Sequence, residues 1–277
     1  MTRTPLVDLD WLAKHANDRN LRVVEVDVDT TLYEKGHLPG AVGWSWTSDL
    51  NDPVRRDVAD RAQIEALLAR SGVTPETTIV LYGDNHNWFA AFGYWLLKYY
   101  GHEDVRLLDG GRRKLEIERV ALTDARPAIA PATYRVTRVR EELRATRDQV
   151  IDAARRATHG LVDVRSPDEY TGKILAPPGL AETALRGGHV PGAINVPWAK
   201  AVNEDGTFRH ADELRALYAA LPAQKDAITY CRIGERSSHT WFVLHELLAR
   251  PNVRNYDGSW TEYGNLIGAP IHRGPEA

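Results

Sequence analysis

The segments GHLPGA, at residues 36–41, and GHVPGA, at residues 188–193, show how this chain is organised. They differ at one position and begin 152 residues apart. Three other pairs recur in the same order: VVEVDVD (23–29) with LVDVRSP (161–167), IVLYGD (79–84) with ITYCRI (228–233), and LDGG (108–111) with YDGS (256–259). Because four landmarks in one order do not repeat by chance, the chain is a tandem duplication of a unit of roughly 130 residues.

Each copy alternates two kinds of segment. Short apolar runs rich in β-branched residues, such as 78–82 and 227–230, predict buried strands. Amphipathic segments such as 62–71 and 212–221 predict helices. Strands that alternate with helices at this spacing indicate an α/β fold, in which each copy forms a mostly parallel sheet with helices on both faces.

The duplication divides the chain into a first domain at residues 1–124, a linker at 125–140 and a second domain at 141–277. The linker contains PAIAPATYRV (127–136), whose prolines favour an extended chain. The second copy also carries an insertion, KILAPPGLAETALRG (173–187). This insertion is either a surface loop or a cover over a functional site.

Composition limits the classes of protein to consider. The 277 residues carry a net charge of −3, with 35 basic and 38 acidic side chains, so nucleic acid and membrane surfaces are not expected partners. No apolar run reaches the ~20 residues of a membrane span, and the first residues lack a secretory signal pattern. One cysteine and scattered histidines predict neither a disulfide nor a metal site. We expect a soluble cytoplasmic protein without a cofactor.

The only cysteine, Cys231, lies in YCRIGERSS (230–238), directly after a predicted strand and before a predicted helix. At this edge of a parallel sheet, backbone N–H groups and the helix dipole favour an anion. Gly234 allows the loop to adopt positive φ, and Arg232 and Arg236 add positive charge. These effects favour the thiolate and predict a nucleophile that meets an anionic substrate. The alternative is a small buried core cysteine.

Taken together, GHVPGAINVPW, DVRSPDEY, CRIGER and DGSWTEYG make the chain resemble the two-domain rhodaneses, the thiosulfate and 3-mercaptopyruvate sulfurtransferases. The resemblance covers almost the whole chain and implies two tandem rhodanese-like domains, an inactive first one and a catalytic second one. It also implies a ping-pong reaction in which Cys231 takes a sulfane sulfur as a persulfide. The acceptor would then be cyanide or a thiol, including that of a thioredoxin-like protein. The first domain has Gly83 in place of the cysteine and forms no persulfide.

Two other functions share part of this pattern. Cysteine-dependent phosphatases, one family of which shares this fold, require Cys-x5-Arg, which would place the arginine at position 237, where this chain has Ser237. Arg236 closes a shorter loop, whose smaller ring of N–H groups suits a single sulfur atom on the thiolate. The other alternative is a non-catalytic binding module, although such modules usually lose the cysteine.

The loop also bears on the identity of the sulfur donor. Thiosulfate-type relatives have a basic residue next to the cysteine, as Arg232 is here, whereas mercaptopyruvate-type relatives look like CG-S-G. Arg232 therefore favours thiosulfate, a dianion. Against this, Glu235 adds negative charge inside the loop, and Glu169 stands where many relatives have a basic residue. We expect the donor to be bound by loop residues and by one residue of the insertion: Arg232, Gly234, Glu235, Arg236 and Arg186.

Residues outside the loop are expected to shape the site. Trp260 has no counterpart in the first copy, and we expect it to form an apolar wall beside the sulfur, the alternative being an ordinary core tryptophan. By resemblance, Asp163 and Arg165 brace the active-site loop together with Ser237, and the alternative for the charged pair is a surface ion pair. His189 recurs in a copy without a nucleophile, so its predicted role is structural.

Overall fold

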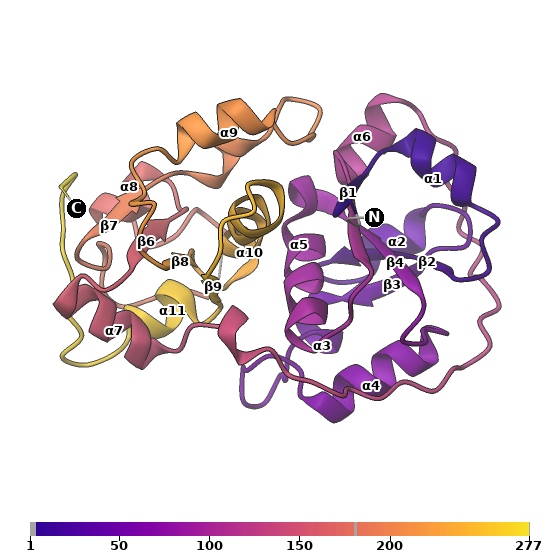
Figure 1. Cartoon of the computed structure of the whole chain (residues 1–277), viewed down its shortest axis with the longest axis horizontal. Coiled ribbons are helices and arrows are strands. Elements are labelled where there is room, and N and C mark those ends of the chain that lie inside the picture. Colours follow the sequence, from indigo (N-terminus) through magenta and orange to yellow (C-terminus); the bar gives the residue numbers. More distant parts are fainter. Residues whose placement is uncertain (1–3, 180–181, 277) are drawn as a thin grey trace. The chain divides into compact units, whose positions relative to one another are not determined.

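The computed structural model describes residues 4–179 and 182–276, and the chain divides into two compact units (Figure 1). The first unit extends to Arg140 and also includes Asn203–Phe208. The second comprises Glu141–Val202 and the chain from Arg209 onward. None of the helices in the described ranges combines the length and the apolar character that a membrane span requires.

The first unit is built on a parallel sheet with the strand order β1-β5-β4-β2-β3. Its strands are β1 (Leu6–Val7), β2 (Leu21–Asp27), β3 (Val42–Ser45), β4 (Thr78–Tyr82) and β5 (Val105–Leu108). Its helices are α1 (Leu9–His15), α2 (Thr31–Lys35), α3 (Trp46–Asp49), α4 (Arg61–Arg70), α5 (Asp84–Tyr99) and α6 (Gly111–Ile117).

The second unit repeats this arrangement with the order β7-β6-β8-β9, again parallel. Its strands are β6 (Gly160–Asp163), β7 (Ala193–Asn195), β8 (Ala227–Tyr230) and β9 (Val253–Tyr256). Its helical segments are η1 (Glu141–Leu143), α7 (Arg147–Arg156), α8 (Pro167–Thr171), η2 (Trp198–Ala201), α9 (Ala211–Leu217), α10 (Glu235–Phe242), the π-helical turn η3 (Val243–Leu247) and α11 (Ser259–Tyr263). The counterpart of β1 is a single parallel bridge between Arg144 and Asn255.

Side-chain alternation along β8 shows that helices cover both faces of the second sheet. Ile228 and Tyr230 point into an apolar cluster with α7 and α11. Thr229, between them, points to the other face, where its hydroxyl donates to the carbonyl of Ser237 in α10 (3.1 Å). Because alternate residues of a strand face opposite sides, this single strand connects the two helical layers. The predicted α/β class with tandem parallel sheets is confirmed.

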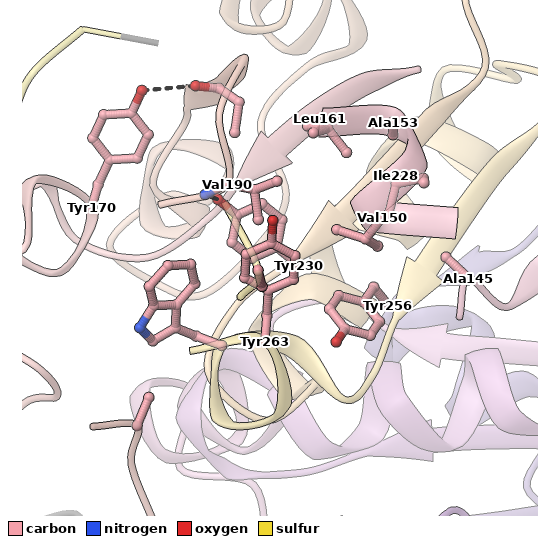
Figure 2. Packing of buried hydrophobic residues seen from close by; sticks show 14 residues of the cluster. Ala145, Val150, Ala153, Leu161, Tyr170, Val190, Ile228, Tyr230, Tyr256 and Tyr263 are labelled. Atoms are coloured by element: carbon pink, nitrogen blue, oxygen red, sulfur yellow. Dashed lines mark hydrogen bonds between the residues drawn. The ribbon is translucent and has the colours of Figure 1, made fainter. Parts of the chain in front are cut away.

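The apolar cluster of the second unit explains the position of α7 (Figure 2). Thr146 and Gln149 form a capping box that fixes the start of this helix. One turn further, Val150 and Ala153 are buried against strand residues such as Leu161. Ile151 and Ala154 pack against the same cluster and the other positions of α7 are polar, so the helix packs one apolar stripe on the sheet.

The two GH-x-PGA segments make the same contacts, which explains why they recur. The ring of His37 stacks on Tyr33 with centroids 3.8 Å apart, and that of His189 stacks on Tyr170 at 3.7 Å. Each tyrosine hydroxyl donates to the backbone carbonyl of the alanine that ends its segment, at 2.9 and 2.7 Å; Figure 2 draws the second of these bonds. The predicted structural role of His189 is confirmed.

In the first unit two aspartates, Asp27 and Asp84, lie at the strand ends that correspond to the cysteine loop of the second unit. After β4, the backbone N–H of Asp84 donates to Oδ1 of Asp27 (2.7 Å). Asn87 fixes the turn, because its Oδ1 accepts the N–H of Gly83 and its Nδ2 donates to the carbonyl of Leu108. Burial, with the charge of Glu25 as the second cause, raises the pKa of Asp27 to about 7.

The raised pKa of Asp27 makes the stability of the first unit depend on pH. The pKa of Asp27 is higher in the folded protein than its ordinary value of 3.8, so its contribution to stability is complete at low pH and is lost as the pH rises through about 7. We expect Asp27→Asn to reduce the fall in Tm between about pH 5 and pH 8 by roughly 4 °C or more. Thermal unfolding followed by circular dichroism measures Tm at each pH. Asp10→Asn, at an exposed position, is the control. Equal pH dependence in the two variants would contradict the assignment.

Candidate active site

Cys231 occupies the short loop between β8 and α10. Its side chain is fully buried, and its Sγ accepts the backbone N–H of Gly234 (3.1 Å). The thiol lies 3.2 Å from Oε2 of Glu235, to which it donates. The sulfur is therefore held between an amide donor and a carboxylate acceptor, both supplied by the first residues after the strand.

Gly234 is required at its position for two reasons. Its φ is +99°, a conformation that residues with a Cβ rarely adopt. A Cβ built there would lie 3.0 Å from the Cα of Asp257, which is backbone and cannot move away easily. The sequence-based assignment of Gly234 to the loop turn therefore agrees with its geometry.

The segment after β9 contacts Cys231 through Ser259. Ser259 Oγ accepts the backbone N–H of Cys231 (3.0 Å), lies 3.9 Å from its Sγ and donates to the carbonyl of Tyr256. The sequence analysis did not select Ser259. The signal was present, because a serine here replaces Gly111 of the first copy, and both residues adopt a φ of +51°. Both units thus share the left-handed conformation, and the second unit alone adds a hydroxyl that accepts the N–H of the cysteine.

The thiol is not activated in the way that the sequence predicted. Burial raises the pKa of Cys231, and the negative charge of Glu235 raises it further. Arg236 and hydrogen bonds from Ser237 act in the opposite direction but are weaker causes. The expectation that the loop favours the thiolate is therefore wrong for this structure, since it did not include complete burial or the contact with Glu235.

Arg236 is bound by carboxylates on both sides. Its two terminal nitrogens donate to the two oxygens of Glu169, at 3.0 and 3.1 Å, and its Nε lies 3.4 Å from Oε1 of Glu235. Glu169 is in turn fixed by the backbone N–H and the hydroxyl of Ser166, which begins α8. The glutamate that departed from the pattern of relatives is therefore the partner of Arg236, and it holds α8 against the loop.

Arg232 connects the loop to the insertion. Its Nη1 donates to the backbone carbonyl of Glu182 (2.6 Å), and its Nη2 lies 4.0 Å from Oε1 of Glu235. The side chain is buried, and its Nε makes no hydrogen bond with the residues that the structure describes. This contact holds the insertion against the cysteine loop at Glu182, while the proposed action of the insertion as a cover stays a prediction.

Arg186 does not present its charge to the sulfur. Its guanidinium donates to the backbone carbonyls at the end of α11 and in the turn after it, those of Gly264, Ala269, Tyr263 and Leu266. Because these carbonyls use all three nitrogens, Arg186 fastens the insertion to the chain after α11. The structure thus gives Arg186 a structural position in place of the expected donor contact.

Trp260 likewise belongs to the core. It is 1% exposed, its backbone N–H donates to the carbonyl of Cys231 (3.0 Å), and its indole N–H donates to the carbonyl of Arg186 (2.9 Å). The guanidinium of Arg165 lies 4.4 Å from the centroid of its ring. A buried tryptophan that supports an arginine explains the residue better than the apolar wall expected beside the sulfur.

Asp163 and Arg165 form a buried ion pair, with side chains 0% and 1% exposed. Nε of Arg165 donates to Oδ1 of Asp163 (3.0 Å), and its Nη2 donates to the carbonyl of Gly188 (2.7 Å). The alternative of a surface pair is wrong. The ion pair ties the end of β6 to the GHVPGA segment, beside the strand that leads to Cys231.

The first unit builds the same ion pair from different positions. Glu25, the counterpart of Asp163, pairs with Arg112 of α6, which donates to the carbonyl of Gly36 (2.8 Å). Arg112 stands where the second copy has Trp260. In the second copy the arginine of the pair is Arg165, which follows β6, and the indole at the position that corresponds to Arg112 packs on it.

A model of the rhodanese-like domain matches residues 8–118 and 146–266, most of both units. The chain belongs to the rhodanese family. In this rhodanese the cysteine loop of the second unit is the candidate active site, and the first unit has Gly83 at the corresponding strand end. Within the described residues, no group of three or more His, Cys, Asp or Glu side chains could hold a metal ion.

Close relatives of this rhodanese match nearly its whole length. A protein of Saccharopolyspora erythraea named "Putative thiosulfate sulfurtransferase" is 53% identical over 98% of this chain and 97% of its own length. The sulfur carrier protein TtuD of Thermus thermophilus is 51% identical over 98% and 97%. SseA of Escherichia coli, a 3-mercaptopyruvate sulfurtransferase of known structure, has a TM-score of 0.79 at 25% identity over 93% and 99%. These relatives identify the rhodanese as a sulfurtransferase.

The geometry of Gly234 leads to a prediction about stability. We expect Gly234→Ala to destabilise the second unit by about 2 kcal/mol or more, because it combines left-handed strain with the contact to Asp257. Gly192→Ala is the matched control: its φ is +82°, but no atom lies within 4 Å of the added methyl group. Urea unfolding measures both variants, and equal losses would show that the contact with Asp257 is unimportant.

The buried pair between Glu169 and Arg236 gives a second prediction. Glu169→Gln leaves the guanidinium of Arg236 without its second carboxylate, so we expect a loss of about 3 kcal/mol in the free energy of unfolding. Asp168→Asn, the exposed neighbour in α8, is expected to change it by less than about 0.5 kcal/mol. Similar values for the two variants in urea would mean that the ion pair does not support the fold.

Proposed function

We propose that this rhodanese transfers a sulfane sulfur from thiosulfate to cyanide or a thiol through a persulfide on Cys231. The observation that carries the proposal is the position of Sγ at the carboxyl end of β8, where the N–H of Gly234 points at it. A persulfide extends from the same atom and carries its charge one atom further out. Amide donors around the loop suit that charge better than they suit a neutral side chain.

The first half-reaction balances without an external oxidant. The thiolate of Cys231 attacks the outer sulfur of thiosulfate, a new S–S bond forms, and the original S–S bond breaks. Sulfite leaves with the electron pair of the broken bond, and the persulfide anion remains on the enzyme. In the second half-reaction the acceptor takes the terminal sulfur and Cys231 leaves as thiolate, so cyanide becomes thiocyanate.

Two observations favour thiosulfate as the donor. The full-length relatives above half identity include proteins named for thiosulfate. Arg232 also places a buried guanidinium beside the cysteine, with an Nε that makes no hydrogen bond with described residues. Such a group gains more from a dianion than from a donor with one carboxylate. The alternative donor, 3-mercaptopyruvate, is supported by the likeness to SseA.

The acceptor in the cell is proposed to be a thiol on another molecule. One relative at 51% identity is named a sulfur carrier protein, which favours delivery of the persulfide sulfur to a protein partner. A thioredoxin-like dithiol is a partner of suitable chemistry, since a thiolate can attack the terminal sulfur and a second thiol can release it. Cyanide is then the convenient acceptor for assays.

Replacement of Cys231 tests the proposal directly. We expect Cys231→Ser to lose at least about a thousandfold in thiocyanate formation from thiosulfate and cyanide, with an unchanged circular dichroism spectrum. Thiosulfate alone should add the mass of one sulfur atom to the wild type and none to the variant, measured on the intact protein. A serine variant with full activity would exclude the persulfide route.

The donor is decided by comparing kcat/KM for the two candidates on the wild type. A higher value for thiosulfate supports the proposal. A higher value for 3-mercaptopyruvate, with the same gain of one sulfur, would keep the persulfide on Cys231 and replace the donor.

A further inference from the structure

We propose that Glu235 is the catalytic base that takes the proton from the thiol of Cys231 when the sulfur donor arrives. This inference rests on the proposed function and gives a specific role to a residue that sequence analysis assigned only to substrate binding. Its starting point is the contact of 3.2 Å between Sγ and Oε2 of Glu235, two buried atoms in hydrogen-bond geometry. A base must lie within such reach of the proton that it removes.

The other groups that contact the sulfur are donors. The N–H of Gly234 donates to Sγ, and Ser237 supplies hydrogen bonds that favour a charged sulfur. The hydroxyl of Ser259 lies 3.9 Å from Sγ, and its proton is donated to the carbonyl of Tyr256. None of these groups can accept a thiol proton and hold it. The sulfur is also fully buried, so bulk water does not reach it in this state. Among the contacts that the described residues make with Sγ, the carboxylate of Glu235 is the one base.

The neighbours of Glu235 orient its carboxylate toward the thiol. Oε1 faces two guanidinium groups, with Nε of Arg236 at 3.4 Å and Nη2 of Arg232 at 4.0 Å. Oε2 is thereby left to face Sγ. Two further charged groups border the loop, and both already have a partner: Glu169 of α8 binds Arg236, and Asp257 after β9 binds Arg144 at 2.8 Å. Neither supplies a second acceptor for the thiol.

The proton balance of the first half-reaction is then complete. The S–H bond of Cys231 breaks, its proton forms an O–H bond with Oε2 of Glu235, and the sulfur keeps the electron pair. That pair attacks the outer sulfur of thiosulfate, and sulfite departs with the electrons of the broken S–S bond. The carboxylic acid of Glu235 then returns its proton to sulfite as it leaves or to the persulfide. No co-reactant beyond the proposed donor is needed.

Removal of the carboxylate of Glu235 changes the rate at neutral pH in opposite directions, depending on whether Glu235 acts as a base or only as a negative charge. The charge of Glu235 raises the pKa of the thiol, so if charge were its whole role, Glu235→Gln would yield more thiolate and a faster enzyme at neutral pH. If Glu235 is the base, the variant must lose its thiol proton to hydroxide. Its rate then falls about tenfold for each unit that the pH decreases, while the wild-type rate stays nearly constant.

The experiment compares wild type and Glu235→Gln in kcat/KM for thiosulfate from about pH 6 to pH 10. We expect a deficit of about a hundredfold near pH 6.5 that shrinks to within about threefold near pH 10. Glu103→Gln, an exposed glutamate of the first unit, is the control and should match the wild type. Glu235→Asp keeps the carboxylate but draws it back by one methylene, and an intermediate deficit is expected. This variant tests the inference if Glu235→Gln does not fold.

A second readout does not depend on the sulfur donor. Cys231 is the only cysteine, so the rate of alkylation by iodoacetamide reports its thiolate directly. The wild-type rate should change little between about pH 6 and pH 8, because the proton moves within the pair, and the glutamine variant should lose this plateau. A variant that is alkylated as fast as or faster than the wild type at pH 6 would overturn the inference.

The two readouts separate the two hypotheses. Loss of the alkylation plateau in a protein that forms no persulfide from thiosulfate would reject the proposed donor and keep the role of Glu235. Turnover of thiosulfate by the wild type, combined with a deficit in Glu235→Gln that is the same at every pH, would keep the proposed function and reject Glu235 as the base.

Discussion

The hydrogen bond between the Cys231 thiol and the Glu235 carboxylate determines which charged residues the site must contain. Both groups are buried, and a buried carboxylate needs charge and hydrogen bonds close by. Arg236 supplies the charge from the next position, and a buried guanidinium then needs a carboxylate of its own, which Glu169 provides. Ser166 completes the chain of contacts by donating to Glu169. The contact between the thiol and Glu235 thus explains why α10 carries Arg236 and why α8 carries Glu169.

The two units show which features belong to the fold and which to the chemistry. Both contain the stacked tyrosine and histidine, and both contain a buried acid paired with an arginine near the GH-x-PGA turn. These contacts persist in the first unit, which has no thiol, so they stabilise the fold. Only the second unit has a left-handed serine under the loop. Gly111 has the same conformation in the first unit, so what distinguishes Ser259 is its hydroxyl, which accepts the backbone N–H of Cys231.

Sequence reasoning succeeded where spacing determines the outcome. The repeat predicted two mostly parallel sheets covered by helices, because strands that alternate with helices at this spacing form α/β units. Cys231 and Gly234 could be placed for the same reason, since a strand end followed by glycine and a helix start leaves the loop little freedom. Residue type and spacing were sufficient for these features.

It failed where the direction of a side chain determines the outcome. Arg186 was expected to contact the sulfur donor, but its guanidinium donates to backbone carbonyls of the protein. Glu169 looked like an unfavourable charge because its partner, Arg236, lies 67 residues away in sequence. The sign of the thiol pKa shift was missed because it depends on burial, which a list of nearby charges does not contain.

The proton on the thiol resolves the question of how a loop with a glutamate can accept an anionic donor. In the resting state the two carboxylates of Glu235 and Glu169 balance the two guanidinium groups of Arg232 and Arg236, which leaves no excess positive charge. A transfer of the thiol proton to Glu235 leaves the total charge of these two groups unchanged. As that proton leaves the sulfur for Glu235, the carboxylate charge disappears and the thiolate takes its place. The nucleophile therefore forms without adding negative charge to the loop that receives the anionic donor.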